Sequence, residues 1–452
     1  MNATTRTAPR GSRAAAAPGP SPAVRLFLPC GQGVEELLAD EVRQHAEGAA
    51  VEAGRGGVFV AGDERLAMRL NLESRLATRV LWPLVEGPYR DEHDLYALAR
   101  RVPWSLWITP AQTLKVDVSA RRSPLTSLNF AALRIKDAVC DHLREATGAR
   151  PGVDTRRPDL PLVLFVGEDH AALYADISGE PLFKRGWRDD TGEAPLKETL
   201  AAALLAAAGW RGRAEDGPLL DPMCGAGTIA IEAAQLACGI APGGARRFAF
   251  ERLAPFKPHL PAWREMLAAA KARVHAPAVP VYAGDVSFRM TDFAARNAER
   301  AGVRAAIDFK TADALQRPAP EATGTLVVNP PYGERIEAKG RRAALPGRQG
   351  FEGADAAEAQ PRASGDAAAF FAALAAHWKR SHAGWTAWVL SPEMRLPSLM
   401  RLKESRRVPL WNGPIECRLF RFDLVAGSAR EPRSAEAPDM GVGGRSGTGP
   451  MQ

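Results

Sequence analysis

Hydrophobic and polar positions follow two different rhythms along this chain. Between residues 24 and 180, apolar runs of strand length are interspersed with stretches of helical periodicity, and some neighbouring strands are close enough to be joined by a turn. This rhythm predicts α+β units. The expected strands are VRLFLP, GGVFVAG, RVLWPLVEG, TLKVDVSA, LVLFVGE and HAALYADIS, and the expected helices cover 33–46, about 64–72 and 129–147.

From about Ala194 the rhythm changes to an alternation of helices and strands. The expected strands are PLLD, VYAGD, AIDFKTAD, TLVVN and TAWVLS, each a short apolar run. Alternation over this length predicts an α/β fold with a Rossmann-like, doubly wound and mostly parallel sheet. Ligands of such sheets bind at the carboxyl ends of the strands, so residues at those ends are the first candidates for chemistry.

Three segments lack any periodic apolar pattern. Residues 1–23 and 428–452 are rich in Pro, Gly, Ser, Ala and Arg, and are expected to be disordered tails. Residues 337–366 follow the sequence NPPYGERI and are too long for an ordinary connection, so they are interpreted as a mobile surface insertion. Whether this insertion acts as a lid or has no role stays open.

Composition and charge exclude several classes of protein. The hydrophobic content of 46% excludes a wholly disordered chain, and no run of about 18 apolar residues is present that could span a membrane. The five cysteines form no CxxC pairs and the eight histidines show no metal spacing, so neither a metal site nor a disulfide framework is expected. A reducing cytoplasm fits this usage. The net charge of +7 permits nucleic-acid binding without requiring it.

The sequence LLDPMCGAGTIAIEAA, residues 219–234, joins an expected strand to an expected helix through a glycine-rich turn. Asp221 ends the strand, and Gly225 and Gly227 allow the backbone to turn tightly and to approach a ligand. Ala230 replaces the third glycine of a dinucleotide fingerprint, and the GK[ST] of a phosphate loop is absent. A carboxylate before the turn repels phosphate and suits an ammonium or sulfonium centre. A tight turn without a ligand is the alternative.

Two further acidic residues stand at expected strand ends. Asp285 ends VYAGD and can accept hydrogen bonds from both hydroxyls of a ribose, although it comes about 60 residues after the glycines instead of the ~20 of a dinucleotide fold. It can equally cap the helix that follows it, as can Ser287. Asp313 ends KTAD and can bind an adenine amine or merely cap a turn.

These elements together resemble the class I S-adenosylmethionine-dependent methyltransferases over residues 194–425. The resemblance implies S-adenosylmethionine as the cofactor, with the glycine turn at its methionine part, Asp285 at its ribose and Asp313 near its adenine. Cys224 is expected to shape the turn and not to act as a nucleophile. The segment 194–203 is implied to lie near the cofactor, or is an ordinary packed helix. The residues expected to contact the cofactor are Asp221, Cys224, Gly225, Gly227, Asp285, Asp313 and Asn329.

The strand TLVVN runs into two prolines, which gives NPPY at residues 329–332. Pro330 and Pro331 lack N–H groups and fix φ, so they stop strand pairing and hold the turn stiff. In the methyltransferases that the chain resembles, this motif marks methylation of an amino nitrogen conjugated to a flat π system. Asn329 Oδ1 and the Pro330 carbonyl would accept the two N–H groups, and Tyr332 would stack on the base. These three residues are the expected catalytic residues, and a plain strand-ending turn is the alternative.

The front half of the chain points to the substrate. Residues 117–143 and 176–205, together with LDPMCGAGT and NPPYGERI, closely resemble the THUMP-containing guanine-N2 methyltransferases of bacterial 23S ribosomal RNA. The resemblance implies methyl transfer to 23S ribosomal RNA or an immature large subunit. Some members of that family carry a second, fused methyltransferase domain, and because this chain ends too early to contain one, the second activity is expected to be absent or to belong to another protein. The implied domains are ferredoxin-like at 24–80, THUMP at 81–180 and methyltransferase at 181–427.

Cationic side chains of the front half are suited to RNA phosphates. Each of them can instead be a solvated surface charge. Transfer-RNA guanine N2, adenine N6 and a non-catalytic RNA-binding assembly factor are the alternative functions. The expected RNA-binding residues are Arg121, Arg122, Lys136, Arg156 and Arg157, with Arg134, Lys184, Arg185 and Arg188 as further candidates.

Overall fold

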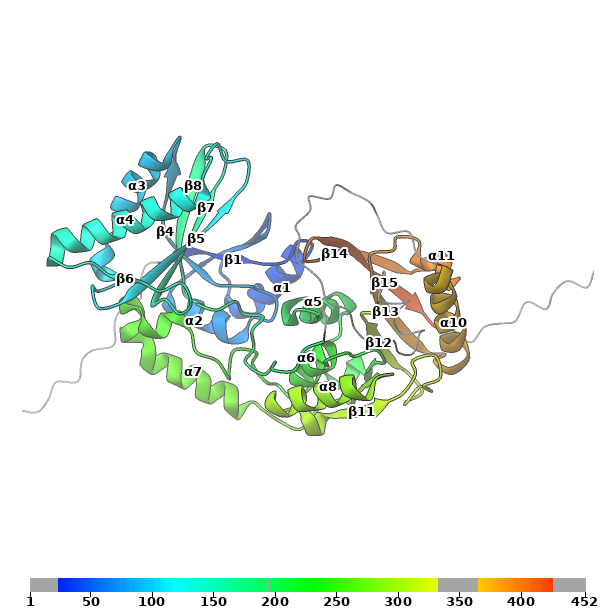
Figure 1. Ribbon diagram of the computed structural model, residues 1–452. Coiled ribbons are helices and arrows are strands. Elements are labelled where there is room, and N and C mark those ends of the chain that lie inside the picture. The colour runs from blue at the N-terminus through cyan, green and yellow to red at the C-terminus, as the bar shows by residue number, and fades with distance from the viewer. Residues whose placement is uncertain (1–22, 193–194, 332–364, 426–452) are drawn as a thin grey trace, which may run out of the picture.

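The computed structural model describes residues 23–192, 195–331 and 365–425. Within these ranges the chain forms two halves that lie side by side, each built on one β-sheet (Figure 1). The expected tails and the expected insertion lie almost wholly outside the described residues, and Tyr332 lies outside them as well. No helix in the described ranges is long and apolar enough to cross a membrane.

The first half carries an eight-stranded sheet in the order β2-β3-β1-β4-β8-β7-β5-β6. Strand β1 pairs with β3 and with β4, and β4 pairs in turn with β8, so the two expected front domains share a single sheet. The elements are β1 (Val24–Pro29), α1 (Glu35–His45), β2 (Val51–Gly54), β3 (Gly57–Gly62), α2 (Glu64–Glu73), β4 (Leu81–Pro88), α3 (Glu92–Arg100), β5 (Thr113–Ala120), α4 (Leu128–Thr147), β6 (Gly152–Val153), β7 (Leu160–Val166) and β8 (His170–Asp176).

The two faces of this sheet bury different side chains. Leu26 and Leu28 of β1 are fully buried in the main core, on the side where the helices pack. Phe27 lies between them in sequence and points to the opposite face, where it stacks on Phe59 with ring centroids 4.7 Å apart. This is the period of two that the strand pattern predicts. The α+β expectation is confirmed, although the short strands β2 and β6 were not expected.

The second half carries a seven-stranded sheet in the order β11-β10-β9-β12-β13-β15-β14. The first five strands are parallel, and β15 runs antiparallel to both of its neighbours. The expected mostly parallel, doubly wound sheet is confirmed. The elements are α5 (Glu198–Ala208), β9 (Leu219–Asp221), α6 (Thr228–Ala237), α7 (Leu260–Ala272), β10 (Val281–Asp285), α8 (Phe288–Arg300), β11 (Ile307–Thr311), β12 (Gly324–Val328), α10 (Gly365–Ser381), β13 (Trp385–Ser391), α11 (Leu396–Met400), β14 (Arg406–Asn412) and β15 (Ile415–Asp423).

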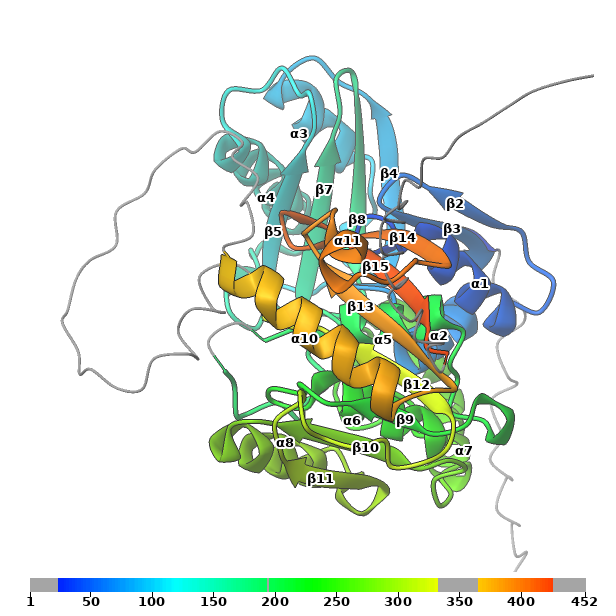
Figure 2. The same cartoon turned by 90° about the vertical axis from the view of Figure 1, so that its right-hand side faces the viewer.

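Helices cover both faces of the second sheet. Helices α5, α6 and α8 pack on one face, and α10 crosses the other face in front of β12 and β13 (Figure 2). Val327 of β12 is buried on the side of α5 and α6, whereas Leu326 and Val328 are buried with Trp378 of α10. The strands are therefore buried on both faces, which explains why they read as continuous apolar runs.

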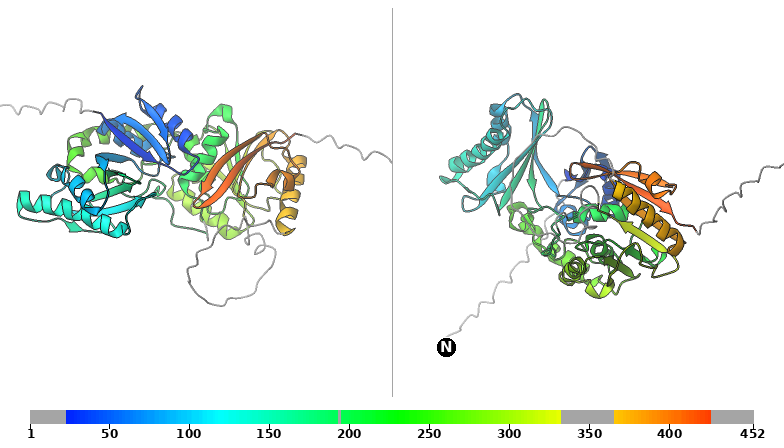
Figure 3. Two further views of the ribbon diagram at one scale, coloured as in Figure 1. Left: turned by 90° about the horizontal axis from the view of Figure 1, so that it is seen from above. Right: turned by 45° about the vertical axis from the view of Figure 1, so that its right-hand side comes forward.

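The long segment between α6 and β10 joins the two halves. Its helix α7 lies against α2 of the first half, and Figure 3 shows the halves in this side-by-side arrangement from above. Phe256, also in this segment, meets Trp82 of β4 edge to face with ring centroids 5.4 Å apart. The segment between α6 and β10, which separates the glycine turn from Asp285 in sequence, therefore packs between the two halves and holds them together.

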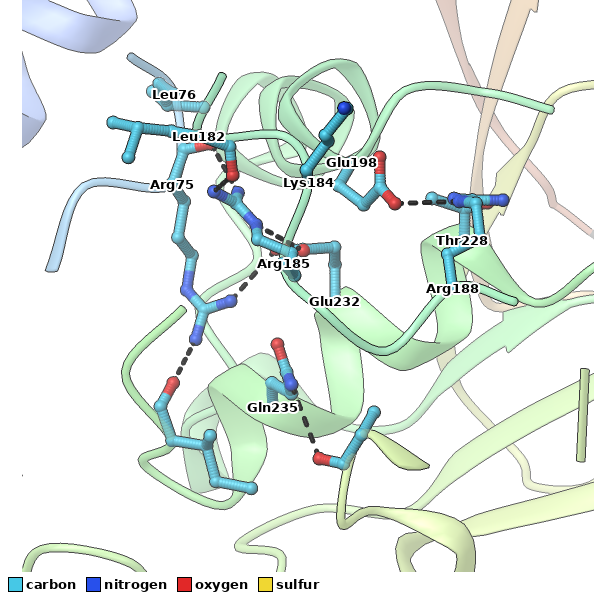
Figure 4. Close-up of polar contacts among 12 residues, drawn as sticks. Arg75, Leu76, Leu182, Lys184, Arg185, Arg188, Glu198, Thr228, Glu232 and Gln235 are labelled. Carbon is cyan, nitrogen blue, oxygen red and sulfur yellow. Dashed lines mark hydrogen bonds and ion pairs between the residues drawn. The ribbon is translucent and has the colours of Figure 1, made fainter. Parts of the chain in front are cut away.

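A buried ion-pair network also ties the halves together (Figure 4). Glu232 of α6 is wholly buried, and its carboxylate accepts hydrogen bonds from Arg75 Nη1 at 2.9 Å and from Arg185 Nε at 3.1 Å. Arg75 follows α2, and its carbonyl accepts a hydrogen bond from Arg185 Nη2 at 2.7 Å. Because α6 begins at the glycine turn, this network fixes the turn against the first half.

Candidate functional site

Three expected site residues meet at one edge of the second sheet. Strand β9 lies between β10 and β12, and all three strands run parallel. Asp221 ends β9, Asp285 ends β10, and Asn329 directly follows β12. The carboxyl ends of neighbouring parallel strands share one edge, so these side chains come from more than 100 residues of sequence into one locality.

The glycine turn is held on the end of β10 by hydrogen bonds. The N–H of Cys224 donates to a carbonyl of β10 at 2.7 Å, and the N–H of Gly225 donates to Asp285 Oδ2 at 3.1 Å. Gly225 and Gly227 have φ values of 52° and 89°, which L side chains rarely adopt. A Cβ at Gly227 would also lie 2.9 Å from the Cβ of Ala294 on α8. The turn itself therefore requires both glycines.

Asp285 serves the local structure with both carboxylate oxygens. Its Oδ1 accepts a hydrogen bond from the N–H of Ser287 at 2.9 Å, and its Oδ2 accepts the one from Gly225. The residue is 4% exposed. Ser287 is the N-cap of α8, and no side chain of the described residues caps the first turn of that helix, so Asp285 fixes the turn that leads into α8 and is not itself the helix cap. A carboxylate oxygen accepts more than one hydrogen bond, and ribose binding by Asp285 stays a prediction.

Asn297 on α8 was not expected from the sequence, yet it organises the site. It is fully buried, and its Nδ2 donates to the carbonyl of Ala226 at 3.0 Å and to that of Asp190 at 2.9 Å. These bonds join the glycine turn to the segment that precedes α5. The available signal was a polar residue on the buried side of an amphipathic helix, which carries no chemical specificity.

Arg317 is a second residue that the sequence did not reveal. It is 5% exposed, and its Nη1 has no hydrogen-bond partner within the described parts of the chain. Gly284 of β10 makes room for the guanidinium, because a Cβ there would lie 2.3 Å from Nη1. Its positive charge lies near the carboxyl groups of Asp308 and Asp221 and partly balances them.

Burial dominates the electrostatics of Asp221. The pKa of Asp221 is raised to about 8, chiefly by burial and also by the neighbouring Asp285 carboxylate, while the hydrogen bond from the N–H of Met223 and the charge of Arg317 oppose the rise. A buried carboxyl with a raised pKa is stabilised as the anion when a positive group binds beside it. Binding of a cationic group at the end of β9 stays a prediction.

The cysteines contribute no reactive group at this site. Burial and the two carboxylates of Asp221 and Asp285 raise the pKa of Cys224 well above its usual value, so the thiol stays protonated and is no nucleophile. All five cysteines are free thiols. Across the described ranges, no three His, Cys, Asp or Glu side chains come together as a metal site would require.

Asn329 has an unsatisfied side chain at the end of β12. Its Oδ1 is buried and accepts no hydrogen bond from the residues that the structure describes. A buried acceptor without a partner is uncommon, because the free energy of removing it from water is not recovered. Pro330 follows it and is buried, while Tyr332 lies outside the described residues. An acceptor in this state favours a ligand that brings an N–H donor.

Asp313 lies in the turn after β11. Its Oδ1 accepts a hydrogen bond from the N–H of Leu315 at 2.9 Å, and its carbonyl accepts from the N–H groups of Gln316 and Arg317. This is the turn-capping arrangement that the sequence offered as the alternative. A role beside adenine stays a prediction.

The expected RNA-binding arginines form two separate groups. Arg121 and Arg122 are exposed after β5, and the pKa of Arg121 is lowered by desolvation and then by the nearby charges of Arg55 and Arg122. Arg156 and Arg157 are exposed before β7, at the opposite end of the parallel β5–β7 pair. The six strand steps between these ends correspond to about 20 Å.

Other expected cations are engaged within the protein. Lys136 is half-buried on α4, with its Nζ 2.9 Å from Asp137. The expectation that Arg185 faces phosphate is wrong, because it is 2% exposed and paired with the buried carboxylate of Glu232. Arg188 is also turned inward, where its Nε lies 2.7 Å from Glu198 Oε1, and its side chain is 14% exposed.

Three known domain families match this chain. Residues 25–81 match the RlmL ferredoxin-like domain, residues 89–176 match the THUMP domain, and residues 185–349 match the RMKL-like methyltransferase domain. The resemblance seen in the sequence is confirmed at the level of these three domains.

Proteins similar over most of the chain agree with these domains. The ribosomal RNA large subunit methyltransferase K/L of Syntrophotalea carbinolica is 38% identical over 412 residues, which are 89% of this chain and 54% of the relative. The chain thus spans about half the length of that relative. A structure described as a possible methylase from Clostridium difficile 630 is 25% identical, with a TM-score of 0.74 over 91% of this chain and all of its own. A methyltransferase complexed with SAH shares the fold, at 23% identity and a TM-score of 0.75 over 89% of this chain and 98% of its own.

The cofactor of such a methyltransferase domain is S-adenosylmethionine, and the site fits it. Asp221 offers a buried carboxylate to a cationic group, and Asp285 offers carboxylate oxygens at the neighbouring strand end. The positive φ values of Gly225 and Gly227 keep the turn free of side chains where a ligand would approach. Asn329 Oδ1 lies at the same edge with an unused acceptor.

Proposed function

We propose that this protein transfers a methyl group from S-adenosylmethionine to the exocyclic N2 of a guanosine in 23S ribosomal RNA, during maturation of the large ribosomal subunit in the cytoplasm. The observation that carries the proposal is the unsatisfied, buried Oδ1 of Asn329 at the carboxyl end of β12, beside the acidic ends of β9 and β10. The ribosomal RNA name of the relative from Syntrophotalea carbinolica supports the choice of substrate.

The residues present suit methylation of a conjugated amine. The lone pair of such a nitrogen is delocalised into the ring, so the amine is a weak nucleophile that must be aligned with the methyl carbon. Asn329 Oδ1 and the carbonyl of Pro330 would accept its two N–H groups and fix this direction. Bound S-adenosylmethionine supplies the electrophilic methyl group. The proton can leave after the methyl has arrived, so the chain needs no strong base beside the amine.

The first half would bring the RNA to this site. The matched THUMP domain at 89–176 contains the exposed pair Arg121 and Arg122, whose charges suit phosphates. A guanine within a ribosomal helix is out of reach of the methyl donor, so it must be unstacked or flipped. An immature, partly unfolded RNA lowers the free energy of that step. Stacking by Tyr332 on the extruded base stays a prediction.

The test is methylation of a defined RNA followed by identification of the nucleoside. Purified protein is incubated with labelled S-adenosylmethionine and 23S ribosomal RNA transcribed without modifications, and the RNA is digested and analysed by mass spectrometry. Labelled N2-methylguanosine is expected with the wild type, and a much weaker signal with Asn329→Ala. Label in transfer RNA alone would overturn the substrate, labelled N6-methyladenosine would overturn the target atom, and RNA binding without any label would favour an assembly factor.

A further inference from the structure

Arg188 has three of its guanidinium contacts fixed beside the glycine turn. Its Nε donates to Glu198 Oε1 at 2.7 Å, and its Nη2 donates to Thr228 Oγ1 at 2.8 Å and to the carbonyl of Leu196 at 3.2 Å. The guanidinium also lies 5.0 Å from the ring of Trp187. Figure 4 shows the side chain between Glu198 and Thr228, so its orientation is set by two helices at once.

The remaining nitrogen of this guanidinium is unused. Arg188 Nη1 is buried and has no hydrogen-bond partner among the described residues. A buried N–H group without an acceptor is uncommon in a folded protein, because its desolvation is not compensated. The other three contacts prevent the side chain from turning toward another acceptor, so Nη1 is left for a group that the described residues do not supply.

The surroundings of Nη1 favour an anion. Thr228 is the first residue of α6, and its N-cap, Gly227, contributes no side-chain acceptor to the first N–H groups of this helix. The amino end of a helix carries partial positive charge and open N–H donors. Asp221 and Asp285 at the strand ends repel an anion, so the side of the turn that carries Arg188 is the better place for one.

We infer that Arg188 receives the carboxylate of the methionine part of S-adenosylmethionine, an assignment that rests on the proposed function. The cofactor carries one carboxylate together with an ammonium and a sulfonium. Asp221 suits the positive groups, whereas Arg188 Nη1 and the start of α6 suit the carboxylate. Arg188 is then a specificity-determining residue that distinguishes the whole cofactor from analogues without the carboxylate.

The test compares two ligands by isothermal titration calorimetry. S-adenosylmethionine and its decarboxylated form share the adenosine, the sulfonium and the ammonium, and differ only in the carboxylate. The wild type is expected to bind S-adenosylmethionine at least ~10-fold more tightly than the decarboxylated form. Arg188→Met should lose most of this preference by weakening S-adenosylmethionine alone, with the decarboxylated form unchanged within about twofold. Lys184→Met, an exposed change in the same segment, is the matched control and should keep the preference.

A purely structural role for Arg188 gives a different pattern. Equal weakening of both ligands in Arg188→Met, or an unchanged preference, would overturn the assignment. Because Arg188→Met leaves Glu198 without its partner, the double variant Arg188→Met/Glu198→Gln is measured as well and should lose the same preference. If the wild type binds S-adenosylmethionine without preferring it, only this assignment fails. If the wild type binds neither compound, the proposed function fails with it.

Discussion

The substitution Asp221→Asn tests whether the buried carboxyl group at the end of β9 lowers the stability of the folded protein at neutral pH while it favours ligand binding. The buried carboxyl has a pKa of about 8 in the folded chain and an ordinary acidic pKa in the unfolded chain. A raised folded pKa stabilises the protein fully only below the unfolded pKa, and this stabilisation is lost as the pH rises through about 8. Asparagine has nearly the same shape and can still accept the hydrogen bond from the N–H of Met223, but it has no charge to bury.

The size of the effect follows from the pKa difference. Each pKa unit corresponds to about 1.4 kcal/mol. At pH 7 the free energy of unfolding of the wild type should therefore be about 4 kcal/mol lower than that of a protein in which Asp221 has an ordinary pKa. At pH 5 the same calculation gives about 2 kcal/mol. The stability advantage of Asp221→Asn over the wild type should therefore be about 2 to 3 kcal/mol larger at pH 7 than at pH 5.

Urea unfolding of the two proteins over a series of pH values measures this difference. Asp308→Asn, which changes an exposed carboxylate on β11, two strands away from β9, is the matched control and should show a stability difference from the wild type that does not change with pH. The affinity for S-adenosylmethionine should be lower in Asp221→Asn than in the wild type. In the wild type alone, this affinity should increase with pH up to about 8, as Asp221 loses its proton. A stability difference between wild type and Asp221→Asn that does not change with pH would refute this account.

Three further changes test other parts of the structure. Asn329→Ala should lower turnover by at least ~100-fold through loss of amine alignment, with RNA affinity nearly unchanged, and near-normal single-turnover rates would contradict this. Replacing Arg121 and Arg122 together by alanine should weaken RNA binding and flatten its dependence on salt, as filter binding at several salt concentrations would show, and an unchanged salt slope would remove the pair from the interface. Glu232→Ala should cost about 3 to 5 kcal/mol of stability, because it leaves two buried arginines unpaired, and a melting temperature equal to that of the wild type would exclude the ion-pair network as a support of the interface.

Much of the fold follows from local patterns in the sequence. The apolar runs of β10 and β12 match the expected strands closely, because a strand buried on both faces leaves a continuous hydrophobic signal. Gly225 and Gly227 could be read as a tight turn, because positive φ is a local requirement that glycine meets without strain. The hairpin of β14 and β15 was not expected. It forms the antiparallel edge of the sheet, and its strands lack the continuous apolar runs of the buried parallel strands.

The sequence by itself therefore determined the class of fold, the glycine turn, and the candidate residues at the ends of β9, β10 and β12. The tertiary structure decided which charges serve a ligand and which serve the fold. Arg185 and Arg188 are close together in sequence, beside other basic residues. Arg185 forms a buried ion pair with Glu232, whereas Arg188 has one buried nitrogen without a partner among the described residues. Burial and hydrogen-bond partners depend on segments far apart in the chain, so no local pattern contains this distinction.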